Sequence, residues 1–363
     1  MTASAPAPQS QAGAPSSSLY EVRAAEPYAA REQVCEVWRE GGLGHTLSPE
    51  ITRQRYDWFY TQNPQGKACL NLLYGNDGSL VGSLGVGARQ LFIDGVAHRA
   101  GVLVDFVVSP RHRSVFPALT LQRKGRELAL RSMDLIYGLP SPKAASVCKR
   151  LETQVSFELP RYARVLHFQA YLRRVLPAWL ATPASWIIDA LDRVRLTARL
   201  FSSPNYAEWV SDFDDSFDTL WNAVDKSGQC IGVRNREFLR WRFGAQPGHT
   251  FEVLAIRRRH DGSLRAYFVC DRSGEALSVA DCLSIGSEDE LVQSLLLLSL
   301  KGRKRGMASV NIRITGLPVL DRALHRAGFR VRSSQSFFAV MDPSTAARVA
   351  SFPWHLTRAD EDV

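Results

Sequence analysis

An aromatic cluster and the turn that follows it occur twice in this chain, and this repetition restricts the possible folds more than any other feature. Residues 58–60 read Trp-Phe-Tyr, with Pro64 and Gly66 soon after, and residues 241–243 read Trp-Arg-Phe, followed by Pro-Gly. An Asp-Gly-Ser-Leu turn comes at nearly the same distance after each cluster, at 77–80 and at 261–264. Self-similarity of this kind indicates one structural unit used twice.

The similarity continues beyond the turns. Val104–Ser109 resembles Ala280–Ile285, and each segment holds an aspartate, Asp105 or Asp281, in an apolar run of the kind that forms buried strands. The first copy has an additional segment around residues 91–95, where Asp-Gly turn chemistry predicts an extra hairpin. We therefore expect two domains of one fold.

The domain boundaries follow from changes in composition. Residues 1–18 are almost entirely Ala, Pro, Ser, Gln, Gly and Thr, which predicts a disordered leader without the features of a signal peptide. We expect a first domain at 19–167, a helical connector at 168–203, a second domain at 204–345 and a tail at 346–363.

The connector has a composition of its own. Trp179, Trp186 and several aliphatic residues lie among five arginines between positions 173 and 201. One interpretation is a helix packed between the two domains. The other is a basic amphipathic segment that contacts an anionic membrane surface. The sequence has no run of 18 apolar residues, so no membrane-spanning segment is predicted.

Charge and cysteine usage exclude several classes of function. The 363 residues include 45 Lys and Arg against 36 Asp and Glu, with the two signs interleaved and no nucleic-acid-binding motif, so we expect no nucleic-acid partner. Six scattered cysteines form no CxxC pair, and no histidine cluster has metal-ligand spacing, so no metal site is predicted. This cysteine usage favours the cytoplasm. The sequence leaves the oligomeric state open.

Hydrophobic periodicity predicts the same series of elements in each copy: helices, antiparallel hairpins, a central strand, a loop, and then helix, strand, helix and strand. In the first copy these elements are expected at 27–40, 52–60, 68–74, 80–86, 89–93, 96–108, 118–131, 135–138, 143–151 and 155–165. This order resembles the GNAT family of N-acetyltransferases. The resemblance implies an α/β (α+β) fold of two tandem GNAT-like domains, each with a central, mostly antiparallel mixed sheet flanked by helices.

The loop after the central strand carries the most specific part of the resemblance. In GNAT proteins this loop reads Arg-x-x-Gly-x-Gly/Ala and opens a helix whose N-terminus binds the pyrophosphate of acyl-CoA. Arg113 matches the arginine and Ala118 the final small residue. The resemblance thus implies acetyl-CoA or another acyl-CoA as co-substrate. The residues implied to bind it are Val107, Val108, Arg111, His112, Arg113, Ser114 and Ala118.

Two residues of this loop depart from the family pattern. Phe116 replaces the central glycine, and Pro117 removes a backbone donor. One interpretation is that CoA binds in a shifted pose, with Arg111, His112 and Arg113 carrying more of the charge. The other is that the loop is an ordinary helix start, with Pro117 at the first helical position.

Acyl transfer to an amine needs a base for the ammonium proton, donors for the thioester oxygen and an acid for the leaving thiolate. Asp105, a carboxylate in an apolar strand, is the candidate base, and the N–H of Val107 or Val108 the candidate donor. Tyr137 and Tyr162 are candidates for protonating the sulfur. The alternative for Asp105 is a structural role, which the matching Asp281 supports, and each tyrosine is alternatively a packed core residue.

The second copy lacks a phosphate-binding loop. Its corresponding helix begins Ser287-Glu-Asp-Glu290, a capping box whose acidic turn repels pyrophosphate. The segment 234–243, rich in arginine and aromatic residues, is either an acceptor-binding surface or an amphipathic helix. We expect an N-acyltransferase that acts on a primary amine, a small molecule such as an amino sugar or cell-envelope precursor. The alternative is a binding or scaffold protein of the same fold that has lost CoA binding.

Overall fold

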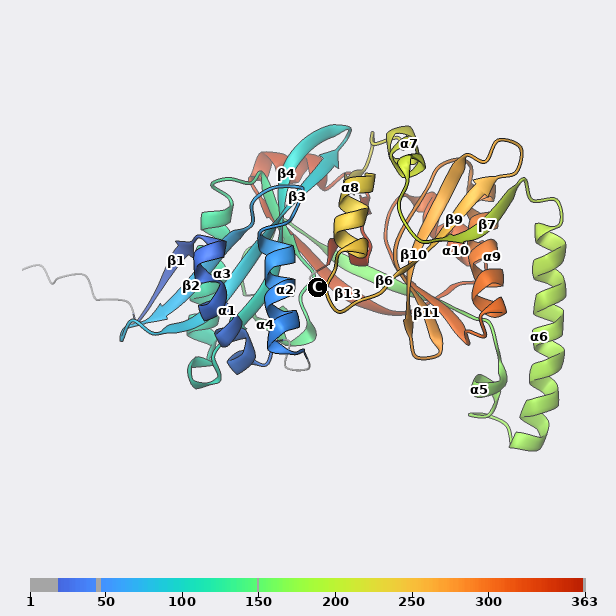
Figure 1. The fold of residues 1–363 in the computed structure, drawn as a ribbon, viewed down its shortest axis with the longest axis horizontal. Coiled ribbons are helices and arrows are strands. Elements are labelled where there is room, and N and C mark those ends of the chain that lie inside the picture. Colours follow the sequence, from blue (N-terminus) through green and yellow to red (C-terminus); the bar gives the residue numbers. More distant parts are fainter. Residues whose placement is uncertain (1–18, 44–46, 149, 362–363) are drawn as a thin grey trace, which may run out of the picture.

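The computed structural model of the chain describes residues 19–43, 47–148 and 150–361. These residues form one 14-stranded sheet with helices on both faces (Figure 1). The mixed sheet and its flanking helices confirm the predicted fold class.

The first five strands form one half of this sheet, in chain order across it. They are β1 (Tyr20–Ala25), β2 (Cys69–Gly75), β3 (Leu80–Ile93), β4 (Val96–Val108) and β5 (Leu135–Gly138). All neighbours are antiparallel except β4 and β5, which are parallel. The Asp-Gly turns lie where they were predicted, with Gly78 and Gly95 at positive φ. The strands expected at 80–86 and 89–93 are one continuous strand, β3, because its interior glycines face close neighbours such as Phe59 instead of breaking the ladder.

The second half repeats this order. Its strands are β7 (Asn205–Val210), β9 (Glu252–Arg258), β10 (Leu264–Ser273), β11 (Ala276–Ser284) and β12 (Ser309–Arg313). Here too the neighbours are antiparallel except for one parallel pair, β11 and β12.

Two strands cross between the halves. β13 (Arg330–Met341), from near the end of the chain, lies between β5 and β6 (Val155–Val165), and β6 in turn pairs with β12. A short strand, β8 (Cys230–Gly232), also joins the end of β3 to β14 (Trp354–His355). The domain limits at 167 and 204 therefore stay a prediction, since the sheet runs across both.

The helices cover both faces of the sheet. They are α1 (Pro27–Gly41), α2 (Pro49–Tyr60), α3 (Val115–Ala129), α4 (Pro142–Cys148), α5 (Gln169–Leu172), α6 (Ala178–Leu200), α7 (Asp215–Ala223), α8 (Arg236–Leu239), α9 (Glu288–Lys304), α10 (Pro318–Arg326) and α11 (Pro343–Val349). The capping box predicted at Ser287 and Glu290 is confirmed at the start of α9. No helix in the described part of the chain has the length and apolarity needed to cross a membrane.

Two segments differ from their predicted placement. The connector helix α6 lies at the outer edge of the second half and not between the halves, because its buried residues, such as Leu196, pack onto the second-half core (Figure 1). Residues 346–361, expected as a tail, contribute Trp354, Leu356 and Ala359 to the main hydrophobic core.

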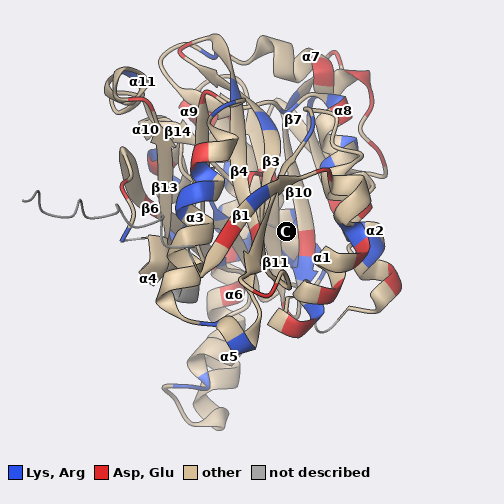
Figure 2. Ribbon diagram, turned by 90° about the vertical axis from the view of Figure 1, so that its left-hand side faces the viewer, with Lys and Arg blue, Asp and Glu red and all other residues tan. Residues whose placement is uncertain are grey.

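Charged residues of both signs are interleaved over the helices, as Figure 2 shows for one face. This distribution matches the pattern read from the sequence, in which neither sign forms a long block.

Candidate active site

The parallel pair β4 and β5 separates before β4 ends. Their ladder runs from Ala100 to Val102 on β4 and stops, whereas β4 continues to Val108 along β3. Beyond Val102 the side of β4 that faces β5 has no ladder partner in β5. This separation opens space beside the end of β4.

A β-bulge marks the same stretch of β4. The β3–β4 register shifts between Ser83 and Gly85, opposite Asp105, and Asp105 has a φ of 50°. A non-glycine residue in this region is strained unless its surroundings hold it. The Asp105 carboxylate, 2% exposed, accepts a hydrogen bond from Arg55 at 2.9 Å and another from Tyr60 at 2.8 Å. These bonds tie the bulge to α2.

The loop after β4 leads directly into α3. A 3₁₀ turn at Pro110–His112 ends β4, and α3 begins at Val115 with Ser114 as its N-cap. Helix geometry leaves the N–H groups of Val115 and Phe116 without intrahelical acceptors. The first turn of α3 contains no acidic residue, so its positive dipole end is not neutralised from within.

Arg113 connects this loop to two neighbouring elements. Its guanidinium donates to the carbonyl oxygen of Gly41, at the end of α1, at 2.8 Å and to that of Val108, at the end of β4, at 3.3 Å. Both acceptors are neutral carbonyl groups, so neither offsets the positive charge of Arg113 beside the start of α3.

Phe116 and Pro117 occupy positions that were not expected. Pro117 is the third residue of α3 and not the first, since the helix starts two residues earlier. The Phe116 side chain is 56% exposed and lies 6.1 Å from the ring of Tyr20, measured between centroids. Phe116 therefore points away from the space beside β4 and does not fill it.

A groove of about 590 Å³ occupies this space. Its lining comes from the end of α1, the end of β4, the start of α3 and α4, and comprises Gly41, Gly42, Leu43, Phe106, Val107, Val108, Arg113, Ser114, Val115, Ala118, Ser141, Ala144 and Val147. Arg113 is the one charged side chain among these described residues. An apolar cleft with one cation and a free helix N-terminus at its edge suits a ligand with an apolar arm and an anionic head.

The groove brings together five of the predicted CoA-binding residues: Val107, Val108, Arg113, Ser114 and Ala118. Arg111 and His112 lie on the 3₁₀ turn outside the lining, where His112 Nδ1 is hydrogen-bonded to the Tyr20 hydroxyl at 3.1 Å.

The three predicted catalytic residues lie outside the lining. Asp105 faces Arg55 and Tyr60, a geometry that favours its structural alternative. Tyr137 is 1% exposed and packs on Phe337, and burial raises the pKa of its hydroxyl.

Tyr162 lies on β6, where its hydroxyl donates to Asp321 of α10 at 2.6 Å. Burial and this carboxylate raise the pKa of Tyr162. Both tyrosines therefore occupy the packed positions that were their alternative interpretation.

Sequence reasoning did not identify the α1 wall of the groove. A Cβ atom on Gly41 would overlap the Val107 side chain, so only glycine allows α1 to end against β4. Gly42 then closes α1 in the left-handed conformation. The Gly-Gly pair at 41–42 is a helix-stop signal that could have located this wall.

The corresponding place in the second half is nearly closed. Beside the end of β11, a cavity of about 100 Å³ is lined by residues that include Cys282, Leu320 and His355. The His355 ring hydrogen-bonds the carbonyl oxygen of Cys282 at 3.2 Å. The neighbouring α9 begins with three acidic residues, which neutralise the positive end of the helix dipole. The second half therefore has a small cavity and no positive helix end beside it.

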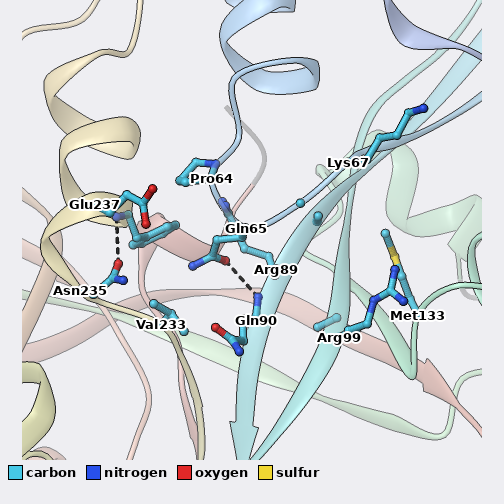
Figure 3. A pocket seen from close by; sticks show the side chains of 14 residues that line it. Pro64, Gln65, Lys67, Arg89, Gln90, Arg99, Met133, Val233, Asn235 and Glu237 are labelled. Carbon is cyan, nitrogen blue, oxygen red and sulfur yellow. Dashed lines mark hydrogen bonds between the residues drawn. The ribbon is translucent and has the colours of Figure 1, made fainter.

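A second cleft lies between the halves (Figure 3). It measures about 310 Å³ and is bounded by the loop after α2, by β3 and by residues 233–238. Gln65 accepts a hydrogen bond from the Gln90 N–H at 3.0 Å, and Asn235 accepts one from Phe238 at 2.9 Å. The guanidinium carbon of buried Arg89 lies 5.0 Å from the centroid of the Phe238 ring and 5.1 Å from that of Trp241. The predicted acceptor-binding segment 234–243 thus contributes to a polar cleft.

No family model and no curated protein sequence matches this chain. Solved structures do match it. A GCN5-related N-acetyltransferase from Anabaena variabilis aligns with 90% of this chain and 74% of its own, at a TM-score of 0.60 and 12% identity. Another GCN5-related N-acetyltransferase, from Kribbella flavida, aligns with 94% of this chain and 82% of its own, at a TM-score of 0.57 and 12% identity.

Saccharomyces cerevisiae N-myristoyltransferase with bound myristoyl-CoA aligns with 91% of this chain and 84% of its own, at a TM-score of 0.52 and 11% identity. All three alignments extend across both halves of the sheet. The chain therefore has the fold of the GCN5-related N-acetyltransferases.

Proposed function

We propose that the chain is an acyl-CoA-dependent N-acyltransferase whose co-substrate binds in the groove beside β4. The observation that carries this proposal is the groove itself, which remains open although Phe116 and Pro117 depart from the usual loop. Among the described residues the cavity beside β11 measures about 100 Å³ against about 590 Å³ for the groove, so we expect one acyl-CoA per chain.

The lining fits the parts of an acyl-CoA. The α3 N-terminus and Arg113 would hold the anionic pyrophosphate, with the N–H groups of Val115 and Phe116 as donors. Pro117 supplies no N–H, so Arg113 would contribute more of the binding than in a loop with a full set of donors. The apolar walls formed by β4 and α4 would cover the pantetheine arm and the acyl chain.

The reaction forms an amide bond and breaks a thioester. The free amine attacks the carbonyl carbon, the C–S bond breaks, and the CoA thiolate takes up one proton while the amine nitrogen releases one. N–H groups of β4 that point into the groove would stabilise the oxyanion, and the Asp105–Arg55 pair would fix the bulge that aims them.

The acceptor is the second part of the proposal. We propose a small primary amine, of which an amino sugar or cell-envelope precursor is one class. The polar cleft of Figure 3, which contains Glu237 opposite Lys67, offers amine and hydroxyl partners of the required kind.

A thermal-shift titration tests the co-substrate. Acetyl-CoA and longer acyl-CoAs should raise the melting temperature of the full chain, because a ligand that binds only the folded state stabilises it. Arg113→Glu should abolish the shift, and Arg113→Lys should keep part of it. Arg123→Glu, on an exposed position of α3 away from the groove, is the matched control and should leave the shift unchanged.

The same titration addresses the alternative function. A flat response of the wild-type chain to every acyl-CoA would overturn the proposal and favour a binding or scaffold protein of this fold. A shift equal in wild type and Arg113→Glu would place the ligand elsewhere.

A further inference from the structure

The helix α6 presents an apolar surface to solvent at the outer edge of the second half (Figure 1). Trp179 is 74% exposed, Trp186 69%, Ile187 62% and Val194 65%. Isolated exposed apolar residues are common on protein surfaces, but a continuous stripe of large ones is not. This surface has no role in the groove or in the polar cleft.

Helical periodicity places these residues on one side of α6. At 100° per residue, Trp179, Trp186, Ile187, Leu191 and Val194 fall within one broad sector. The opposite sector holds Ala181, Ser185 and Leu196, which are the buried residues of the helix. The helix is therefore amphipathic in an unusual sense, because its most apolar side faces outward.

The acidic residues of α6 all face the protein. Asp189 accepts a hydrogen bond from the Phe168 N–H at 3.1 Å and lies 3.3 Å from His167. Asp192 pairs with Arg164 at 3.2 Å and Arg303 at 2.5 Å. Both carboxylates therefore have partners on the inner side of α6, and the charge of Asp192 is offset by two arginines.

The cations flank the outward side. Arg193 and Arg195 lie on either edge of the apolar stripe, and Arg173 and Arg174 lie in the turn that precedes the helix. All four are exposed, and within the described residues no carboxylate lies in ion-pair distance of them. The outward surface therefore combines large apolar side chains with unneutralised positive charge.

We propose that the outward side of α6, together with the turn at 173–176, docks on an anionic phospholipid bilayer with the helix lying in the plane of the interface. Aromatic and aliphatic side chains would enter the acyl boundary while the arginines meet lipid phosphates. α6 and α5 project beyond the rest of the molecule in Figure 2, so the sheet does not obstruct a flat surface there.

Charge complementarity favours a bilayer over a second copy of the chain. Two copies that paired through this stripe would bring Arg193 and Arg195 close to the same residues of the partner, without acidic residues on the stripe to neutralise them. An anionic bilayer supplies a counter-charge for each arginine and an apolar layer for each tryptophan.

Vesicle flotation tests the docking with the full chain and without acyl-CoA, so its outcome is independent of the proposed reaction. The chain should float with phosphatidylcholine vesicles that contain roughly a third phosphatidylglycerol, and far less with pure phosphatidylcholine. Raising the salt concentration should weaken the binding. Trp186→Ser with Ile187→Ser should reduce binding at least tenfold, and Arg193→Gln with Arg195→Gln at least fivefold.

Matched controls separate docking from unspecific adhesion. Tyr28→Ser, at an equally exposed aromatic on α1, and Arg123→Gln with Arg332→Gln should bind as wild type does. Absence of wild-type binding to anionic vesicles, or equal binding by the Trp186→Ser, Ile187→Ser variant, would overturn the proposal. So would a dimer in sedimentation velocity that this variant dissociates, because the stripe would then be an interface between copies.

Discussion

Trp58 and Trp241 exchange hydrogen bonds across the junction of the two halves. The indole N–H of Trp58 donates to the carbonyl oxygen of Trp241 at 2.7 Å, and that of Trp241 donates to Trp58 at 3.0 Å. Their rings stack with centroids 4.9 Å apart. These are the residues that identified the repeat in the sequence, so the two copies meet through their equivalent positions.

Because the hydrogen bonds are reciprocal, we expect substitution of either tryptophan to reduce the stability of the chain by a similar amount. Trp58→Phe or Trp241→Phe should each lower the free energy of unfolding by about 1–3 kcal/mol, because each removes a donor and leaves a buried carbonyl without its partner. Urea denaturation measures the loss. Trp186→Phe, at an exposed position, should change stability by less than about 0.5 kcal/mol. Equal effects of all three substitutions would contradict the structural role of the pair.

Substitutions in the Asp105–Arg55 pair distinguish two possible roles of Asp105. It either positions the bulge or acts as the catalytic base. Asp105→Asn and Arg55→Gln should each destabilise the chain by about 3 kcal/mol or more, since each removes one partner of a buried ion pair. If Asp105 positions the bulge, both variants should lose acyl-CoA binding to a similar degree. A loss of kcat confined to Asp105→Asn, with acyl-CoA binding intact, would instead identify Asp105 as the base.

Gly41 tests the α1 wall of the groove. Gly41→Ala should force α1 away from Val107, lower the melting temperature and weaken the acyl-CoA shift. Gly244→Ala is the control, since a Cβ atom there meets nothing within 4 Å and the backbone is not left-handed. If Gly41→Ala had the same melting temperature and acyl-CoA shift as this control, α1 would be able to move away from Val107 without loss of stability.

We expect buried His355 to make the stability of the chain fall in acid. Burial, with Arg234 nearby, lowers the pKa of His355 to about 4. The unfolded chain therefore takes up a proton between about pH 6.5 and 4 that the folded chain does not, so stability falls as the pH drops through this window. Wild type should lose about 2–3 kcal/mol more than His355→Asn between pH 7 and 4, as measured by urea denaturation at each pH. Parallel pH profiles would contradict this assignment.

Local signals were sufficient for part of the fold. The Asp-Gly turns located the hairpins, and Ser287 with Glu290 located the start of α9, because these structures depend on neighbouring residues. The exchange of β6 and β13 could not be read in this way. Strand pairing between distant segments depends on the packing of the whole sheet. Neither strand contains a local sequence signal that identifies the strand with which it pairs.

The groove was predictable on one side only. Arg113, Ser114 and Ala118 follow from the loop pattern, and Val107 and Val108 from the strand before it. Gly41 and α4 reach the groove through tertiary packing. The sequence left open whether Phe116 allows CoA to bind, because the position of its ring next to Tyr20 depends on β1, which lies far away in the sequence.

The position of β13 also governs how this protein can be assembled. A fragment that ends at residue 167 would lack the strand that separates β5 from β6, and β5 would expose a bare row of amide and carbonyl groups. Such an edge recruits other chains. The first half therefore depends on residues 330–341 for a paired edge, so a chain truncated before β13 is expected to aggregate instead of forming a smaller independent domain.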